Sequence, residues 1–551
     1  MRTIDAKVLQ EMLISGANNL FNHYPEIDAL NVFPVPDGDT GMNMNLTLAS
    51  GAKEIENRND QDVYSVALLF SKGLLMGARG NSGVITSQIF RGFAQSIEGK
   101  KNINSVCLAD AFAKGSEVAY KAVMRPVEGT ILTVIRESSA AAVIYSKENS
   151  DAEKVLKYMI NEAKASLKRT PDLLPVLKEV GVVDSGGAGL VKILEGMYQA
   201  LIGKFIEKKE ISRTTNNTAQ QAIESDEFGY CTEFILRLDP ENKKPFIENR
   251  FKSVLQNHGN SLVVVHDGDI VKVHVHTLNP GAILTYGQSF GEFVKIKVEN
   301  MTEQHTSLQE KKEGQTEEAK EEEKPLKHTP TKTVGMVAVA AGEGVEETFK
   351  DMGVDEIVSG GQTMNPSIVN LVNAIRKTDA KTVFIFPNNS NIIMAALQAK
   401  DVLHEEVEVV VVNTKTIPQG IAAVSQFSPD LSAEDNLTNM KEVIEHIKSG
   451  EVTYAIKDTK IDNVQIKKDD FMAIMDKKIV CCESKPEKAL AKMLRKMIKE
   501  DNYLATIFVG SNVSEKIFNE LKKDLPKTYP NIEFDIRRGN QPVYDYLVGI
   551  E

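Results

Sequence analysis

Two hydrophobic periods divide the chain into helical and strand-rich parts. Up to about residue 205, apolar residues recur at helical spacing, beginning with Leu9, Met12 and Leu13. In the next part the period changes to two, in segments such as SLVVVHDGDIVKVHVHT and EFVKIKVEN. Further on, short apolar strands alternate with helices, as in VGMVAVAAG, KTVFIFP and VEVVVVNT. That alternation is typical of a parallel sheet covered by helices on both faces.

These patterns predict a multidomain protein in which two polar linkers join three folded parts. An all-α helical domain is expected at 1–205, a small α+β domain at 228–300, and an α/β domain at 333–551. The stretch 206–227 is polar and unpatterned, so we interpret it as a linker. The stretch 301–332 is dominated by Glu, Lys, Gln and Thr, and this composition is typical of a solvated, flexible tether.

Composition narrows the function classes. The 65 basic and 77 acidic side chains give a formal charge of −12, which argues against a general nucleic-acid-binding protein. The first 20 residues carry Asp5 and Glu11 within an apolar pattern, which indicates an amphipathic helix and not a signal peptide. No apolar run reaches the roughly 18–20 residues of a membrane span. The four cysteines lack CxxC spacing and indicate reduced thiols, so we expect a cytoplasmic protein.

Glycine-marked turns carry the candidate chemistry of the helical domain. They are PDGDTG, GARGNSG, PVEGT (126–130) and DSGGAG (184–189), and each lies between apolar helices. Such turns offer backbone N–H groups at a helix N-terminus, where an anion binds well. The hydroxyl groups of Ser82 and Thr130 add donors suited to phosphate oxygens. None is a Walker loop, and each alone is also consistent with a simple connection between helices.

The stretch NVFPVPDGDTGMNMN (31–45) adds two carboxylates to these turns. Prolines and glycines shape it as a turn, and Asp37 and Asp39 stand on either side of Gly38. Two such carboxylates are hard oxygen ligands that a divalent cation would neutralise, and Mg²⁺ combines carboxylate with phosphate oxygens. The alternative is an Asp-Gly turn that caps a helix starting near Met42.

The motifs NVFPVPDGDTGMNMN, SKGLLMGARGNSGV, GTILTVIRES and VDSGGAGL, in this order, resemble the ATP-binding subunit of fatty acid kinase. The first 200 residues also resemble the ATP-binding subunit of bacterial dihydroxyacetone kinase, a barrel of antiparallel helices that holds Mg-ATP at one end. The C-terminal domain is similar to the DegV-type fatty-acid-binding proteins. The resemblance implies a kinase that phosphorylates the carboxylate of a fatty acid presented by a DegV-type partner protein. Its product would be an acyl-phosphate for phospholipid synthesis.

The resemblance also implies roles for individual residues. Asp37 and Asp39 match the Mg²⁺-binding aspartates, and Asn31 is the nearest polar counterpart of a third aspartate in dihydroxyacetone kinase. Thr40 stands where that family has a histidine, and with the two aspartates it completes the implied catalytic set. Arg79, Arg125 and Arg136 are candidate charge neutralisers. The residues that match ATP-contacting turns are Asn43, Gly80, Asn81, Ser82, Gly83, Thr130, Asp184, Ser185, Gly186 and Gly187.

The middle domain carries a second candidate site. His274 and His276 are two residues apart on a predicted strand and therefore share one face, and Cys231 opens another strand. A cysteine with two histidines suits Zn²⁺, although buried strand histidines beside a core thiol fit the same pattern. The resemblance favours a metal here, and it implies that this domain forms a homodimer.

Polar loops of the C-terminal domain follow its predicted strands, where open α/β sheets bind ligands. They are GGQTMNPS (360–367), PNNSN (387–391), TIPQG (416–420) and RRGNQPVYDY (537–546). The resemblance makes this domain a docking surface for the partner. Cys481 and Cys482 lie in an apolar strand and are expected in the core.

Three rival functions stay open at this point. The first is a dihydroxyacetone kinase, but the chain lacks an evident ketone-binding domain. The second is a non-catalytic lipid-binding or regulatory scaffold, against which stand the intact aspartates and glycine turns. The third is a metal-dependent hydrolase centred on Cys231, His274 and His276.

Overall fold

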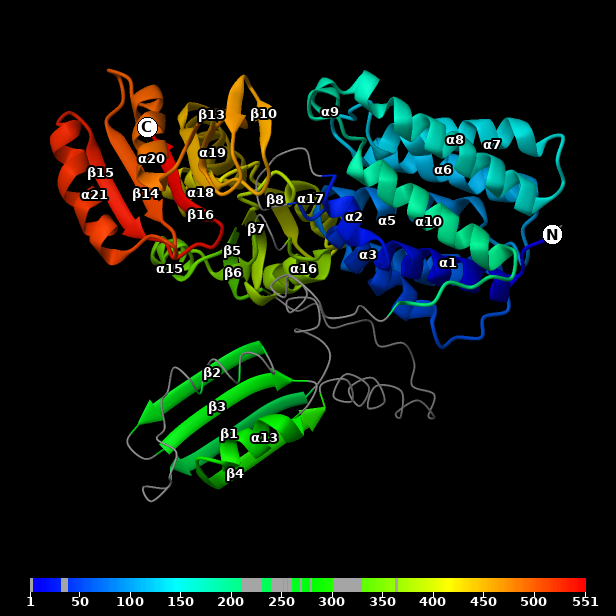
Figure 1. The fold of residues 1–551 in the computed structure, drawn as a ribbon, viewed down its shortest axis with the longest axis horizontal. Helices are drawn as coiled ribbons and strands as arrows, with labels where there is room; N and C mark the ends of the chain where they lie inside the picture. The colour runs from blue at the N-terminus through cyan, green and yellow to red at the C-terminus, as the bar shows by residue number, and fades with distance from the viewer. Residues whose placement is uncertain are drawn as a thin grey trace. The chain divides into compact units, whose positions relative to one another are not determined.

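The computed structural model describes residues 3–30, 38–209, 230–238, 251, 255, 260–267, 270–277, 280–300, 330–361 and 365–551 (Figure 1). The chain forms two compact units. One comprises Met1–Lys209 together with Thr329–Glu551, and the other comprises Glu210–His328. Most of both predicted linkers, and the residues Asn31 and Asp37, lie outside the described residues.

The N-terminal part of the larger unit is built from helices, as its 3.6-residue period predicted. Several of them begin where an aspartate or asparagine side chain accepts a backbone N–H of the first turn, as Asp5 does for Val8 and Asp62 for Ser65. The helices are α1 (Ala6–Phe21), α2 (Tyr24–Asp28), α3 (Thr40–Ile55), α4 (Val63–Gly77), α5 (Gly80–Ser96), α6 (Ser105–Ala122), α7 (Ile131–Ser146), α8 (Ala152–Leu173), α9 (Pro175–Val180) and α10 (Ser185–Leu201).

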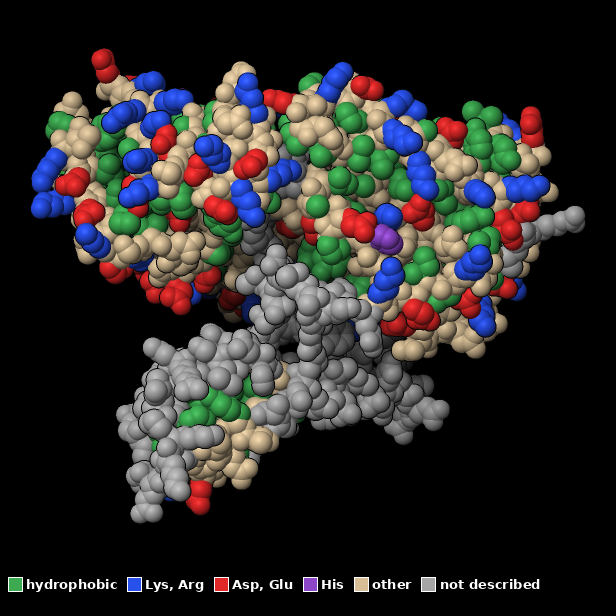
Figure 2. Space-filling model, in the orientation of Figure 1, with side chains coloured by type: hydrophobic (Ala, Val, Ile, Leu, Met, Phe, Trp, Pro, Cys, Tyr) green, Lys and Arg blue, Asp and Glu red, His purple; other side chains and the backbone are tan. Residues whose placement is uncertain are grey.

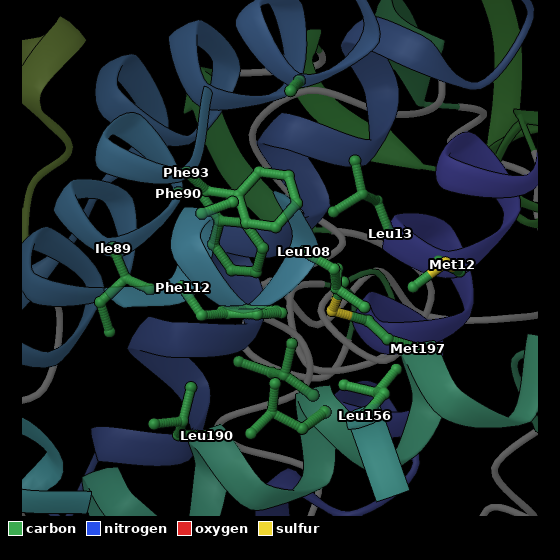
Figure 3. Close-up of a cluster of buried hydrophobic side chains, with 14 of the residues drawn as sticks. Met12, Leu13, Ile89, Phe90, Phe93, Leu108, Phe112, Leu156, Leu190 and Met197 are labelled. Atoms are coloured by element: carbon green, nitrogen blue, oxygen red, sulfur yellow. The ribbon is translucent and has the colours of Figure 1, made fainter. Parts of the chain in front are cut away.

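The apolar faces of these helices form one continuous core (Figure 3). Aromatic rings pack edge to face within it, with centroids 5.2 Å apart for Phe70 and Phe90 and 5.1 Å apart for Phe93 and Phe112. The last helix, α10, packs closely against the first, α1. A Cβ atom on Gly196 would lie only 2.5 Å from the carbonyl oxygen of Ser15, so only glycine fits at this contact. The Ser15 hydroxyl also donates to the Gly196 carbonyl at 2.8 Å. This close contact closes the helical barrel.

The C-terminal part of the larger unit contains two sheets. The first has the strand order β6-β5-β7-β8 and is entirely parallel, as its short apolar strands predicted. Helices α16 and α17 bury side chains in the core on one face, and α15, α18 and α19 contribute to the core on the other. The elements are β5 (Lys332–Ala340), α15 (Glu343–Asp351), β6 (Glu356–Ser359), α16 (Ile368–Lys377), β7 (Ala380–Phe386), α17 (Ile393–Val402), β8 (Glu408–Val411), α18 (Ile417–Ser425) and α19 (Ala433–His446).

The second sheet has the order β13-β12-β9-β16-β14-β15 and is antiparallel except between β14 and β15. Its central strand β16 overlaps the end of the stretch 537–546, which the sequence pattern predicted to be a polar loop. Its elements, with a short hairpin beside them, are β9 (Lys448–Tyr454), β10 (Thr459–Ile461), β11 (Val464–Ile466), β12 (Phe471–Met475), β13 (Lys478–Glu483), α20 (Pro486–Met497), β14 (Leu504–Val509), α21 (Glu515–Thr528), β15 (Glu533–Arg538) and β16 (Tyr544–Ile550).

The smaller unit is an antiparallel sheet of order β2-β3-β1-β4 with a helix. Phe234, Leu236, Val273 and Val275 are fully or almost fully buried in its core. Strands β2 and β3 form a hairpin, because Asp267 at the end of one strand pairs with Ile270 at the start of the next. The elements are β1 (Tyr230–Leu238), β2 (Asn260–Asp267), β3 (Ile270–Thr277), α13 (Pro280–Gln288) and β4 (Gly291–Asn300).

The surface agrees with the modest net charge. Lys and Arg side chains alternate with Asp and Glu side chains over the visible face of the larger unit, without a field of one sign (Figure 2). Among the residues that the structure describes, no helix has both the length and the hydrophobicity needed to cross a bilayer. Cys481 and Cys482 are half-buried in β13 and pack against two different apolar clusters.

Candidate active site

Two of the glycine-marked turns meet where α3 and α5 begin. Asp39 is the N-cap of α3, and Arg79 is the N-cap of α5. The Ser82 hydroxyl lies 3.5 Å from the carbonyl oxygen of Thr40, and a Cβ atom on Gly80 would lie 2.7 Å from Nδ2 of Asn43. The structure therefore brings the predicted residues Asp39, Thr40, Asn43, Gly80, Asn81, Ser82 and Gly83 to one place.

Two glycines of the second turn, Gly80 and Gly83, belong to α5 and not to a loop before it, whereas Gly77 ends α4. The sequence pattern predicted a helix starting at Val84, but α5 begins at Gly80, whose φ is +57°. A Cβ atom on Gly83 would lie 2.4 Å from the hydroxyl oxygen of Thr47, so α3 and α5 cross at a distance that only glycine permits here.

The N-terminus of α5 is the best-suited anion site among the four turns. No side chain caps α5 from its N-cap position, in contrast to α7 and α10. The first N–H groups of a helix have no partner within the helix, and its N-terminus carries partial positive charge. The N–H groups at Gly80, Asn81 and Ser82 therefore suit a phosphate group next to Asp39.

Asp28 supports this arrangement, and the sequence motifs did not reveal it. Its carboxylate accepts the backbone N–H of Gly41 at 2.6 Å and that of Met42 at 3.3 Å, and so it caps α3 from the end of α2. Burial raises the pKa of Asp28 to about 6, against the opposing effect of the two N–H groups. Asp28 thereby fixes the direction in which α3 presents Asp39.

The other two turns meet each other across α7 and α10. Asp184 is the N-cap of α10, where its carboxylate accepts the N–H of Gly187 at 2.7 Å and also a backbone N–H of Ile131. Burial raises the pKa of this carboxyl to about 6. The Thr130 hydroxyl caps α7 at Leu132 and donates to the carbonyl of Val127.

These hydrogen bonds engage the side chains of Thr130 and Asp184 with the protein itself. Their predicted contacts to ATP stay predictions. The Gly187 N–H is engaged by Asp184, so the backbone N–H groups of Ser185 and Gly186 are the part of this turn suited to a ligand. The pair of turns lies beside α3, because a Cβ atom on Gly189 would lie 2.7 Å from the Met44 side chain.

The structure separates the three candidate arginines. The Arg79 guanidinium donates to the carbonyl oxygen of Asn365 at 3.3 Å and lies beside the start of α5. The Arg136 guanidinium forms two hydrogen bonds to the Glu128 carboxylate, at 2.6 and 2.9 Å. Arg125 is exposed. Arg79 is therefore the arginine that the fold positions at the junction of α3 and α5.

A residue of the C-terminal part also reaches this site. The side-chain amide of Asn365 donates to Oδ2 of Asp39 at 2.6 Å, although the two residues are 326 positions apart in the chain. Asn365 is 2% exposed. It belongs to the loop 360–367, which the sequence pattern assigned to ligand or partner binding in the C-terminal domain.

The donor set fits a magnesium-nucleotide complex. The described part of the site supplies the Asp39 carboxylate and uncapped helix N–H groups. It also supplies the buried side-chain oxygens Oδ1 of Asn81 and of Asn365, which lack a hydrogen-bond partner in the structure. Hard oxygen atoms beside phosphate-binding N–H groups are the surroundings that Mg²⁺ with a nucleotide requires. Asn31 and Asp37 lie outside the described residues, so their predicted metal contacts remain predictions.

A cavity with a volume of about 500 Å³ lies in the C-terminal part. It is bounded by the ends of β5, β6 and β7 and by residues 540–544, as expected for an open α/β sheet. Three glutamates, Glu343, Glu346 and Glu451, are among the described residues that line it, and no Lys, Arg or His is among them. A carboxylate ligand would therefore be repelled from this cavity.

The second candidate site is described only by its backbone. Cys231 pairs with His276, and Glu233 pairs with His274, across the antiparallel strands β1 and β3. Directly opposed residues share one face of a sheet. The side chains of Cys231, His274 and His276 lie outside the described residues, and the described side chains contain no group of three or more metal-ligating residues. The zinc site stays a prediction.

Comparisons with known proteins agree with this organisation. The model of the DAK2 domain matches residues 34–199, and the models of the FakA-like (fatty acid kinase) middle and C-terminal domains match residues 227–308 and 335–551. Protein YloV of Bacillus subtilis is 46% identical, and the alignment covers 100% of both chains. An uncharacterized protein of Staphylococcus aureus (strain USA300) is 44% identical over 100% of this chain and 99% of its own.

The solved structures are less similar to this chain than the relatives above. The dihydroxyacetone kinase of C. freundii, in complex with AMP-PNP and Mg²⁺, is 19% identical, with 36% of this chain and 35% of that chain covered and a TM-score of 0.29. The Streptococcus pneumoniae fatty acid kinase B3 protein loaded with linoleic acid is 12% identical, with 40% of this chain and 98% of that chain covered and a TM-score of 0.28.

The matched domains define the class of the protein as a kinase-type subunit, and its activity class as phosphotransfer. The chain belongs to the FakA-like family of fatty acid kinase proteins.

Proposed function

We propose that this protein is the ATP-binding subunit of a fatty acid kinase. In this proposal the chain transfers the γ-phosphoryl group of ATP to the carboxylate of a fatty acid held by a separate binding protein. The observation that carries the proposal is the uncapped N-terminus of α5 facing Asp39 at the start of α3. The product is an acyl-phosphate, a precursor for phospholipid synthesis.

The residues of the chain divide the task of holding ATP. The N–H groups at the start of α5, with the Ser82 hydroxyl, bind phosphate oxygens. Asp39, together with Asp37, would hold the magnesium ion, and Arg79 would balance charge beside the same turn. The bound ion supplies charge neutralisation at the phosphates of ATP. Because phosphoryl transfer has a loose transition state, this positioning and neutralisation account for most of the catalysis.

The absence of a histidine base from these turns agrees with a carboxylate acceptor. The segments PDGDTG, GARGNSG, PVEGT and DSGGAG contain no histidine. A fatty acid carboxylate is already ionised near pH 7 and needs no proton removed, whereas a hydroxyl acceptor such as dihydroxyacetone requires a base. Thr40, in the place of the histidine of dihydroxyacetone kinase, agrees with a carboxylate acceptor.

The acidic cavity of the C-terminal part supports an acceptor delivered by another protein. The three glutamates on its wall disfavour a bound fatty acid carboxylate in this chain. We therefore infer a fatty-acid-binding partner of the DegV type. A homodimer formed through the middle domain and a cytoplasmic location complete the proposal.

One assay tests this function directly. The purified chain is incubated with ATP, Mg²⁺ and oleate, with and without a DegV-type fatty-acid-binding protein, and acyl-phosphate is measured by trapping with hydroxylamine. We expect acyl-phosphate only when both proteins are present. Phosphorylation of dihydroxyacetone by the chain, or no ATP-dependent turnover with either acceptor, would overturn the proposal.

A further inference from the structure

The catalytic end of the helical barrel packs against the C-terminal part within the larger unit. Helices α16 and α17 lie at the end where α3 and α5 begin (Figure 1). Ala78 and Val84, which flank the glycine turn of α5, belong to the same apolar cluster as Ile368 of α16 and Ala395 of α17. The two parts therefore share buried apolar surface next to the proposed phosphate site.

Polar contacts fix the relative position of the two parts at this junction. The backbone N–H of Ile368 donates to the Ala78 carbonyl at 3.3 Å, and the Asn81 side chain donates to Asn391 at 3.2 Å. Further from the site, Gln88 donates to Gln398 at 2.9 Å, and both of these side chains are buried. A buried hydrogen bond between amides needs defined geometry, so the junction has one preferred alignment.

Asn365 is the residue of this junction that contacts Asp39. It lies two residues before Ser367, which starts α16 with a reciprocal capping box to Asn370. Its main-chain carbonyl accepts from Arg79, and its side-chain amide donates to Asp39 at 2.6 Å. The main chain and the side chain of Asn365 are thus both bonded to residues at the start of α3 and α5.

A hydrogen bond to one oxygen of a metal-binding carboxylate has a known effect. It orients the carboxylate so that the other oxygen faces the ion, and the removal of such a partner typically weakens metal binding about 10- to 100-fold. Asn365 donates to Oδ2 of Asp39 and so restrains the orientation of this carboxylate. The buried Oδ1 of Asn365 itself has no hydrogen-bond partner in the structure.

We propose that Asn365 is a positioning residue of the kinase site, so that the C-terminal domain completes the magnesium site of the helical domain in cis. This inference rests on the proposed function, because it assigns Asp39 to the metal. It gives the C-terminal domain a role inside the catalytic site, in addition to any role in partner docking.

The test compares Asn365→Ala with a matched control, Gln398→Ala, in the full-length chain. Gln398→Ala removes a buried amide contact of the same junction that lies away from Asp39. Mn²⁺ serves as the metal probe, and its affinity in the presence of ATP is measured by electron paramagnetic resonance. Thermal unfolding of each variant reports whether the junction has been destabilised. Asp39→Ala is measured alongside as a reference for the loss of the metal site.

We expect Asn365→Ala to weaken Mn²⁺ binding about 10- to 100-fold while Gln398→Ala stays within about twofold of the wild type. Asn365→Ser, which keeps a donor, should recover part of the loss. Unchanged or tighter binding in Asn365→Ala, or an equal loss in both variants, would overturn the inference. If Asp39→Ala binds Mn²⁺ and ATP like the wild type, the metal assignment of the proposed function fails instead, and the two failures are distinguishable.

Discussion

The substitution Gly80→Ala tests whether the start of α5 binds the phosphates. Gly80 adopts a φ of +57°, and a Cβ atom there would lie 2.7 Å from Nδ2 of Asn43. The left-handed conformation alone costs an alanine about 1–2 kcal/mol. The collision adds to this cost, because real Cβ atoms do not approach a nitrogen this closely.

The protein can relieve this strain only by a movement within the proposed site. Either the Asn43 side chain is displaced, or the first turn of α5 rotates and redirects the N–H groups of Asn81 and Ser82. A hydrogen bond to a charged group contributes about 1.5–3 kcal/mol. The loss of one such bond to a phosphate therefore weakens ATP binding about 10- to 100-fold, since each 1.4 kcal/mol is a factor of ten.

Gly99→Ala is the matched control for this prediction. Gly99 has a φ of +70°, but nothing lies within 4 Å of a Cβ atom placed on it. Both variants should lose thermal stability, whereas only Gly80→Ala should lose ATP affinity, as measured by isothermal titration calorimetry. ATP binding of Gly80→Ala at the wild-type affinity, or an equal loss in both variants, would refute the assignment of α5 to the phosphates.

Three further predictions address the metal, the pH dependence and the middle domain. Asp39→Ala should abolish ATP-dependent turnover while the helical fold is kept, because the Asp39 side chain does not cap α3. Some fall in melting temperature is expected from the lost hydrogen bond to Asn365, and full activity would contradict the metal role. Burial raises the pKa of Asp28 from 3.8 to about 6, so its contribution to stability is complete below pH about 4 and is lost as the pH rises through 6. Asp28→Asn should therefore flatten the change of melting temperature between pH 4.5 and 7, and an unchanged slope would contradict this reasoning. The wild-type chain should contain zinc by elemental analysis and Cys231→Ser should not; retention of zinc in the variant would exclude the thiol as a ligand.

The fold was largely predictable because hydrophobic periods are local. A stripe such as Leu9, Met12 and Leu13 specifies a buried helix face without reference to distant residues, and the apolar run VFIF (383–386) specifies burial on both faces. The sequence pattern predicted that α5 and α10 begin at Val84 and Gly189, four residues too late in each case, because glycine lowers helix propensity. Their glycines serve helix crossing instead, as the contact of Gly83 with Thr47 and that of Gly189 with Met44 show.

Strand β16 was hidden for a different reason. The residues RRGNQP before it are polar, so the sequence pattern predicted a loop over 537–546. The end of this stretch instead belongs to β16, which is buried in the centre of the second sheet. Tyr546 is fully buried between β9 and β14, where burial raises the pKa of its phenol. A central position in a sheet depends on pairing with strands far away in the chain, and a local period carries no information about such pairing.

The site was predictable only within single turns. The segment 39–43 and the segment 80–83 were each recognisable, and their contact follows from the packing of α3 on α5. Asp28 was missed because its carboxylate acts on a helix that begins 12 residues later. Asn365 could not be assigned, because a hydrogen bond between residues 326 positions apart leaves no signal in the spacing of either motif.

The contacts around Asn365 bear on whether the C-terminal part acts as a lid or as a fixed wall of the site. A lid that opens in each cycle needs an interface with few buried contacts, so that opening costs little free energy. Here Ala78 and Val84 lie in a shared apolar cluster, and the amides of Gln88 and Gln398 satisfy each other in a buried position. Opening would expose this apolar surface and would also break the hydrogen bond between the two side-chain amides. The junction is therefore a fixed wall of the site. Under the proposed function, a fatty acid carried by a partner would have to reach the phosphates from a side of the barrel end that the C-terminal part leaves open.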